Sequence, residues 1–454
     1  MPFPRVTREL AVLIKLASPI LIAQLAQMGM GFVDTVMAGR LSSIDLAAVA
    51  LGTSIWIPIN LFIVGVLMAT IPAIAQLFGG DQQHKIRGTL HQAMWLALLM
   101  GAIAWLLLRY SPYLLLLLHV DARLYPITHD YLLALSWGMP AVAFYITLRC
   151  FCDALNHTLP NMIISILGLL LNIPFNYVLI YGKLGFPALG AVGCGWATMA
   201  VMWLMLLVMA GYVFVAPRFS HFKLTEVVSW PQKTALLYLL KLGLPIGLSI
   251  FFEISIFSVI ALLLGSLGAE VIASHQVALN FASLIFMLPL SISMALTIRV
   301  GQATGRQDKS AARFTCQVGM GLTVALALLL SISMVFSRHW ITALYTHDIA
   351  VQNLAAHLLI YAAVFQISDG LQAACNGALR GLKDTQAPMF ITLIAYWCIG
   401  LPVGYLLGLT PVFSAAPWGA EGFWLGLVLG LSVAAVMLGA RLIYCFSPRS
   451  PYFA

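Results

Sequence analysis

Residues 16–20 of this chain read Leu-Ala-Ser-Pro-Ile, and residues 242–246, 226 positions later, read Leu-Gly-Leu-Pro-Ile. The same offset places Gln76 on Gln302, so one register covers both stretches. Further pairs match at offsets of 226, 228 and 229: Gly39 with Gly265, Gly79 with Gly305, Pro160 with Pro388, Pro174 with Pro402, Tyr177 with Tyr405, Gly190 with Gly419 and Gly193 with Gly422. A duplicated hydrophobic unit of this size is typical of transporters built from two related lobes with a binding site between them.

The composition is that of a membrane protein. Apolar residues make up 62% of the chain and charged residues 8%, whereas a soluble domain carries roughly 25% charged residues. Runs of about 20 apolar residues recur along the whole length, and each can cross the hydrocarbon core of a bilayer as a helix. We therefore predict an all-α membrane protein with twelve transmembrane helices, arranged as two parallel six-helix repeats.

The hydrophobic runs also set the expected domain organisation. The predicted spans are 10–37, 44–77, 89–110, 127–152, 158–181, 189–215, 237–264, 270–303, 314–336, 347–377, 387–408 and 418–446. The second and eighth spans are long enough to require tilting or bending, and Pro58, Pro72 and Pro289 are the expected bends. We predict an N-terminal six-helix lobe at 1–216, a cytoplasmic linker at 217–236 and a C-terminal six-helix lobe at 237–454.

The basic residues predict the orientation, because Lys and Arg near helix ends stay on the cytoplasmic side. With both termini inside, only five of the 23 Lys and Arg residues fall outside: Arg40, Arg109, Arg123, Lys183 and Arg338. This bias accounts for the net charge of +8, so no nucleic acid partner is needed. The seven scattered cysteines are typical of apolar packing residues, and Cys150 and Cys152 lack the His or Cys cluster that would complete a metal site. We expect no cofactor.

Three acids fall well inside the predicted spans: Asp34, Glu253 and Asp369. A charge at the bilayer centre costs about 2.5–3.5 kcal/mol on insertion scales, so such residues usually serve ions or substrate. The alternative is a buried carboxyl that helps helices to pack. Their repeat partners are Ile260, Gln27 and Ala141, in that order. Because the shared scaffold does not require these acids, their asymmetry indicates chemistry added to one lobe.

Helical spacing groups the acids with other polar side chains. The expected polar surfaces are Gln24, Gln27, Gly31 and Asp34 in the first span, Gln366, Asp369, Gln372 and Asn376 in the tenth, Gln276, Asn280 and Ser283 in the eighth, and Asn172 and Asn176 flanking Pro174 in the fifth. Amide pairs such as Asn172 and Asn176 can equally hold helices together. Aromatic residues near the acids, such as Phe286, belong to the core or hold a cation by the ring face.

The sign of the interior charges indicates the solute. Glu253 and Asp369 have no basic partner at helical spacing, so cations are their expected partners. A buried carboxylate needs a proton or a cation, and Na⁺, H⁺ and an organic cation therefore compete for such acids. If the lobes rock between inward and outward states, entering Na⁺ can displace a drug to the outside.

Several motifs resemble a known family. They are residues 31–39 (GFVDTVMAG), 171–177 (LNIPFNY), 251–253 (FFE), 275–280 (HQVALN) and 377–384 (GALRGLKD). Over nearly the full chain they resemble the NorM branch of the multidrug and toxic compound extrusion (MATE) family. The resemblance implies an exporter in the bacterial inner membrane that exchanges Na⁺, or in some members H⁺, for amphipathic cationic drugs.

The resemblance also implies roles for individual residues. Glu253 and Asp369 match acids linked to cation binding in the C-terminal lobe, which makes them the Na⁺ candidates. Asp34, Asn172 and Asn176 match residues that line a site in the N-terminal lobe. Phe286 stands where one relative has a tyrosine, and Asp348 matches an outer acid that contacts drugs in one relative. Further expected substrate-lining residues are Gln27, Gln276, Asn280 and Gln372. We expect a monomer in contact with membrane lipids.

Three other functions fit the sequence less well. A lipid-linked oligosaccharide flippase of the same superfamily would want Arg or Lys in mid-membrane, where this chain has few. A membrane-embedded enzyme would need a nucleophile or metal cluster. A passive channel does not need duplicated lobes with a polar interface, which favour alternating access.

The predicted topology can be tested by cysteine labelling. Single cysteines at Ser220, in the linker, and at Lys183, between the fifth and sixth spans, are placed in a cysteine-free background. In intact cells an impermeant thiol reagent should label position 183 and spare position 220. The reverse pattern would contradict the orientation.

Overall fold

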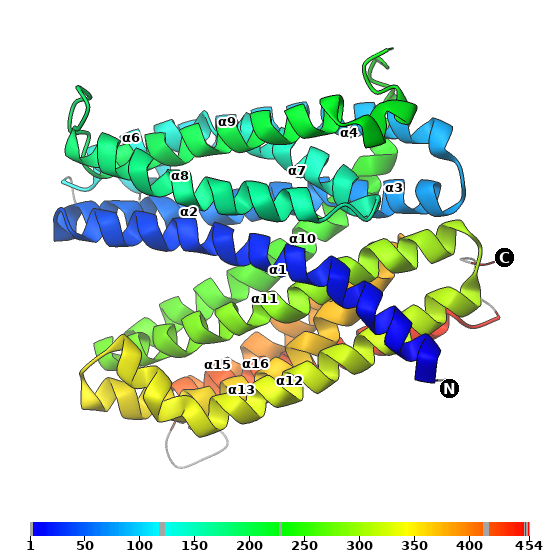
Figure 1. The fold of residues 1–454 in the computed structure, drawn as a ribbon. Coiled ribbons are helices and arrows are strands. Elements are labelled where there is room, and N and C mark those ends of the chain that lie inside the picture. Colours follow the sequence, from blue (N-terminus) through cyan, green and yellow to red (C-terminus); the bar gives the residue numbers. More distant parts are fainter. Residues whose placement is uncertain are drawn as a thin grey trace. The chain divides into compact units, whose positions relative to one another are not determined.

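A computed structural model describes residues 3–117, 123–226, 229–411, 417–448, 450 and 453 (Figure 1). The described residues form helices and no strand. The elements are α1 Phe3–Gly39, α2 Ser43–Leu67, α3 Thr70–Gly79, α4 Gln83–Tyr110, α5 Pro112–Leu117, α6 Tyr125–Ser136, α7 Met139–Ala154, α8 Leu159–Tyr181, α9 Ala191–Val215, η1 Pro217–Phe222, α10 Lys233–Leu264, η2 Gly265–Leu267, α11 Ala269–Gly305, α12 Lys309–Tyr345, α13 Ile349–Gly381, α14 Gln386–Leu393, η3 Ile394–Gly400, α15 Leu401–Leu409 and α16 Ala420–Cys445.

The helices confirm the predicted fold class. Among the described residues, eleven helical segments are long and apolar enough to span a membrane, and the pair α6 and α7 makes a twelfth. This pair is bent by 41°, which the sequence analysis did not predict. Pro140, at the second position of α7, suits a helix start because the missing N–H has no helical partner there.

The prolines expected to bend the long spans have different settings, and their bends stay a prediction. The second span breaks between α2 and α3, just before Pro72, as the length of that span required. At Pro58 and Pro289, however, α2 and α11 continue as single helices. A proline removes one backbone hydrogen bond and need not end a membrane helix, because neighbouring groups satisfy the freed carbonyl.

Contacts divide the chain into two compact units, one from Ser18 to Gly247 and the other formed by Met1–Ala17 together with Leu248–Ala454. Helices α1 and α10 therefore contribute residues to both units. The lobe boundaries at 216 and 237 follow the sequence repeat instead, and they stay a prediction.

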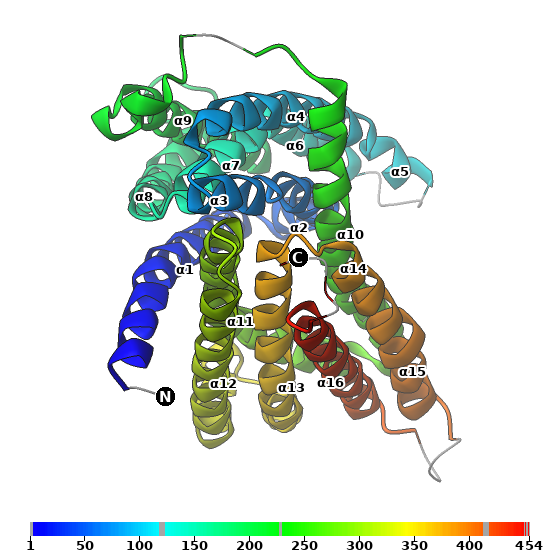
Figure 2. The ribbon, with the colours of Figure 1, turned by 90° about the vertical axis from the view of Figure 1, so that its right-hand side faces the viewer.

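In the first unit, α9 packs against α6, α7 and α8, and α4 packs against α7 (Figure 1). In the second unit, α13 packs against α11, α12 and α16 (Figure 2). The start of α1 is fastened to this unit by an ion pair. Arg299 on α11 donates two hydrogen bonds of 2.9 and 3.0 Å from one nitrogen to Glu9, and Thr315 on α12 donates another of 2.8 Å.

The two sequence repeats also share backbone geometry at corresponding glycines. Gly190 precedes α9 at φ 59° and ψ −140°, and Gly419 precedes α16 at φ 62° and ψ −133°. Glycine adopts positive φ at little cost, so the same residue is required twice. Three residues later, a Cβ on Gly193 would lie 2.7 Å from the backbone of Leu179, and a Cβ on Gly422 would lie 2.5 Å from the backbone nitrogen of Gly408. Both glycines allow two helices to cross at backbone contact.

The predicted linker is held by side chains of α4. The backbone N–H of Ser229 donates to Nδ1 of His91, so the other ring nitrogen carries the proton and donates to the carbonyl of Leu224 at 2.9 Å. Gln92 donates to the Trp230 carbonyl and accepts from the N–H of Gln232, each at 2.8 Å. Trp95 donates to the Ser229 carbonyl at 3.0 Å and stacks on Trp230.

The glycine crossings can be tested by adding one methyl group. Gly193→Ala and Gly422→Ala should each lower the melting temperature of detergent-purified protein, because overpacking against backbone costs about 1–3 kcal/mol. Gly211→Ala on α9 and Gly439→Ala on α16 are matched controls, since a Cβ there meets nothing within 4 Å. Equal melting temperatures for the crossing and control variants would contradict the contact.

Candidate functional site

The carboxylate of Asp34 on α1 is held by three neutral side chains inside the first unit. Asn172 and Asn176 on α8 donate to one oxygen at 3.1 and 2.6 Å, and Thr198 on α9 donates to the other at 2.8 Å. Asp34 is 7% exposed, and both amides are fully buried. The predicted trio of Asp34, Asn172 and Asn176 therefore does come together, while its role stays a prediction.

The local sequence explains this arrangement. Asn172 and Asn176 are one helical turn apart, so their side chains point the same way and also bond to each other at 3.0 Å. Asp34 makes no ion pair within the described part of the chain; its partners are amides and a hydroxyl. Thr198 was missed by the sequence analysis. A lone threonine in an apolar helix gives no periodic signal.

The second unit holds the other two acids. Glu253 lies on α10 and Asp369 on α13, and they are close enough for their charges to interact. Among the described residues, no donor makes a hydrogen bond to either carboxyl. The oxygens of Glu253 and Asp369 are thus available for a proton or a cation.

Two further residues interact with members of this acidic pair. Tyr396 interacts electrostatically with both carboxyls and donates a hydrogen bond of 2.7 Å to Gln372. Arg380 is buried on α13, and its charge interacts with Glu253. Helical spacing alone predicted no basic partner for Glu253 or Asp369. The interaction links different helices, α10 and α13, which sequence spacing cannot reveal.

Tyr396 sits in a π-helical turn, η3, which interrupts the eleventh span between α14 and α15. Such turns are rare and frequently lie at functional sites. The next residue, Trp397, donates from its indole nitrogen to the carbonyl of Phe252 at 3.2 Å. The π turn therefore fastens the backbone beside Glu253 while Tyr396 faces the acids.

The remaining predicted site residues each make their own contacts. Gln27 donates to Ser165 in the first unit at 3.2 Å. In the second unit, Gln276 is exposed, Phe286 is partly buried and Asn280 accepts a bond of 3.2 Å from Tyr345. Asp348 caps the N-terminus of α13 by accepting from the N–H of Ala350 at 2.9 Å, which gives it a structural role whatever else it contacts.

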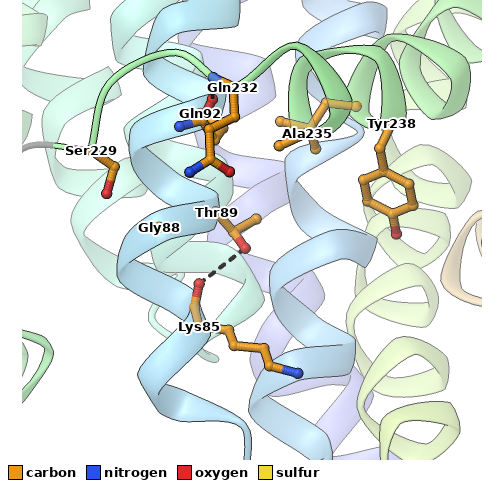
Figure 3. A pocket seen from close by; sticks show the side chains of 9 residues that line it. Lys85, Gly88, Thr89, Gln92, Ser229, Gln232, Ala235 and Tyr238 are labelled. Carbon is orange, nitrogen blue, oxygen red and sulfur yellow. Dashed lines mark hydrogen bonds between the residues drawn. The ribbon is translucent and has the colours of Figure 1, made fainter.

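A cavity of about 290 Å³ lies elsewhere in the first unit, between α4, the linker and the start of α10 (Figure 3). Its lining includes Lys85, Thr89 and Gln92 on α4 and Tyr238 on α10. None of the predicted site residues lines it. Within the described residues there is also no group of three or more His, Cys, Asp or Glu side chains placed to hold a metal ion.

The fold and the two polar clusters define an integral membrane protein that spans the bilayer many times as a duplicated helical bundle. The chain belongs to the MatE family, whose model matches residues 19–178 and 245–406. The two matched segments begin 226 residues apart, which is the offset of the repeat. Members of this family are transporters, so the chain is a transporter and not an enzyme.

Named relatives and solved structures agree with this assignment. The chain is 46% identical to multidrug resistance protein NorM of Vibrio cholerae over 97% of this chain and 96% of that protein. It is 48% identical to multidrug resistance protein PmpM of Pseudomonas aeruginosa over 96% and 92% of the two chains. The fold matches the eukaryotic MATE transporter AtDTX14 with a TM-score of 0.88 at 21% identity, over 99% of this chain and 97% of that one.

The Asp34 cluster predicts a difference between two substitutions. Asp34→Asn should leave the melting temperature close to that of the wild type, because the asparagine oxygen still accepts from both amides. Asp34→Leu should lower it, since each buried donor left without a partner costs about 1–3 kcal/mol. Thermal unfolding of purified protein measures both, and equal values would contradict the hydrogen-bonded geometry.

Proposed function

We propose that this chain is a secondary active multidrug exporter that exchanges extracellular Na⁺, or H⁺, for intracellular amphipathic cationic drugs by alternating access. The observation that carries the proposal is the buried carboxylate of Asp34, whose partners within the described residues are all neutral. The names of the relatives from Vibrio cholerae and Pseudomonas aeruginosa support it.

The chemistry of the Asp34 cluster suits exchange. Three hydrogen bonds orient the carboxylate but add no positive charge, so a proton, a metal cation or an organic cation can supply the compensating charge. Each of these cations excludes the others from one site. Binding of the coupling ion then favours release of the drug.

The acidic pair of the second unit suits the coupling ion. Glu253 interacts with both Asp369 and the guanidinium of Arg380, so this group of two acids and one base carries one net negative charge when both acids are ionised. One monovalent cation neutralises the cluster. The hydroxyl of Tyr396 and the amide of Gln372 place further oxygens near the acids, and hard cations prefer several oxygen ligands.

The proposal includes the membrane, the topology and the oligomeric state of the protein. The bias of Lys and Arg supports an inner-membrane protein with both termini in the cytoplasm. We expect a monomer surrounded by lipids. The flippase alternative would want a basic residue free to meet phosphate in mid-membrane, whereas the buried Arg380 already faces Glu253.

The decisive experiment is dye efflux from inverted membrane vesicles, driven separately by a sodium gradient and by a proton gradient. An antiporter moves a cationic dye under at least one gradient and stops when that gradient is collapsed. Dye movement that needs no gradient, or none under either, would contradict antiport.

The acids of the second unit give a sharper prediction. Glu253→Gln and Asp369→Asn should each abolish gradient-driven efflux, because too few charged oxygens remain for Na⁺. Binding of a fluorescent cation to the purified variants should persist but cease to respond to added Na⁺. Glu270→Gln, which removes an exposed carboxyl on α11, is the matched control.

The outcomes separate the possible coupling ions. A variant that keeps wild-type displacement of bound drug by Na⁺ removes that acid from the coupling site. If both variants lose the Na⁺ response but efflux driven by a pH gradient survives, the proton is the working ion.

A further inference from the structure

The first unit also contains a line of buried polar side chains. On α8 it comprises Asn161, Ser165, Asn172 and Asn176, which follow i, i+4, i+11 and i+15 and so lie on one face. All four are fully buried. Placing polar groups inside the membrane costs free energy, and such groups are usually functional. Four buried polar residues on one face of a helix therefore require an explanation.

Helix α7 contributes a matching face. Tyr145, Arg149 and Asp153 are spaced four residues apart and are at most 5% exposed. The Tyr145 hydroxyl donates to Asn161 at 2.7 Å and lies 3.4 Å from the Ser165 hydroxyl. Because Ser165 also accepts a hydrogen bond from Gln27, side-chain contacts join α1, α7 and α8.

The polar side chains of α7 continue toward the C-terminal end of this helix. Arg149 and Asp153 form a buried pair with 3.4 Å between the Arg149 Nε and one Asp153 oxygen. Asp153 lies in the last turn of α7, three residues before the exposed Asn156. At its other end the polar face reaches Asp34 through Asn172 and Asn176.

Several atoms of this face have no hydrogen-bond partner among the residues that the structure describes. They are Oδ1 of Asp153, Nδ2 of Asn161 and Oδ1 of Asn176. Buried polar atoms are nearly always hydrogen-bonded, so such atoms mark places for ordered water.

Helix packing alone does not account for the face. The offset of 228 that matches Pro160 and Pro174 to their counterparts gives the repeat partners of the polar residues. They are Met389, Leu393, Gly400 and Gly404 for the α8 residues and Ala373, Gly377 and Gly381 for the α7 residues. None of these is polar, so the duplicated scaffold packs these two helices without the polar groups.

We propose that the polar face of α7 and α8 is a hydrated proton relay that connects Asp34 with Asp153. The proposal rests on the proposed antiport, because a relay matters only if Asp34 exchanges its cation. A proton that leaves the Asp34 carboxyl is accepted by a neighbouring water, which releases another proton onward. The hydroxyls of Ser165 and Tyr145 pass protons in the same way, while the amides hold the waters in place.

Tyr145, Cys150 and Cys152 interact electrostatically with Asp153, and further ionisable groups lie around both ends of the polar face. Tyr131 and Cys194 interact with Asp34, and Arg149 interacts with Asp153. The Asp153 carboxylate accepts the proton beside the Arg149 guanidinium and then releases it to bulk water, which restores the ion pair. No bond other than those to hydrogen is made or broken.

The test uses purified full-length protein in liposomes that contain a pH-sensitive dye. Tyr145→Phe removes the hydroxyl and keeps the ring, and Asp153→Asn removes the terminal acceptor. Both should slow proton movement triggered by a cationic drug at least tenfold. Drug binding at equilibrium and Na⁺-driven drug efflux should stay within twofold of the wild type.

Thr147→Val is the matched control. It removes a fully buried hydroxyl from α7 that bonds to the carbonyl of Ala143 and does not touch the relay. Its proton movement should equal that of the wild type.

Three results overturn the proposal. Wild-type proton movement in both Tyr145→Phe and Asp153→Asn overturns the relay alone. An equal loss of proton-driven and Na⁺-driven transport together with a lower melting temperature shows a purely structural face. Wild-type protein that moves no drug under either gradient overturns the proposed antiport and the relay with it.

Discussion

The bilayer interior supplies no hydrogen-bond partners, and this constraint governs where polar side chains can stand in the protein. Backbone groups are satisfied within helices, so any further polar group must find its partner inside its own unit. Asp34 does so through Asn172, Asn176 and Thr198. Among the described residues, no side chain donates a hydrogen bond to Glu253 or Asp369, although the charge of Arg380 interacts with Glu253, and this difference distinguishes the second cluster from the first.

Duplication explains how one scaffold carries two kinds of site. Gly193 and Gly422 occupy matching positions where two helix backbones come too close for a larger side chain. The three membrane acids, Asp34, Glu253 and Asp369, have no acidic counterpart in the other repeat. Packing is thus the shared property of the two halves, and charge is the property that each half acquired on its own.

Much of the architecture follows from the sequence, since hydrophobic length and the repeat offset act along the chain. The grouping of Asn172 with Asn176 was also predictable, because one helical turn separates them. Thr198, Tyr396 and Arg380 were not, since each meets its partner across helices that are distant in sequence. The 41° bend between α6 and α7 was missed because its apolar sequence continues through it.

The held linker changes how the chain between the repeats should be regarded. Fixing each residue of a loop costs about 1–2 kcal/mol of conformational entropy, which His91, Gln92 and Trp95 offset by five hydrogen bonds to its backbone. These bonds go to main-chain atoms, so they constrain the path of the linker more than its composition. Exposed linker side chains without contacts can vary, whereas packing restricts the buried Phe219, Phe222 and Leu224, and stacking on Trp95 restricts Trp230. Inserted or deleted residues shift the register of the backbone bonds. For protein engineering, we therefore expect this segment to tolerate substitutions at its exposed positions far better than it tolerates an inserted fusion partner.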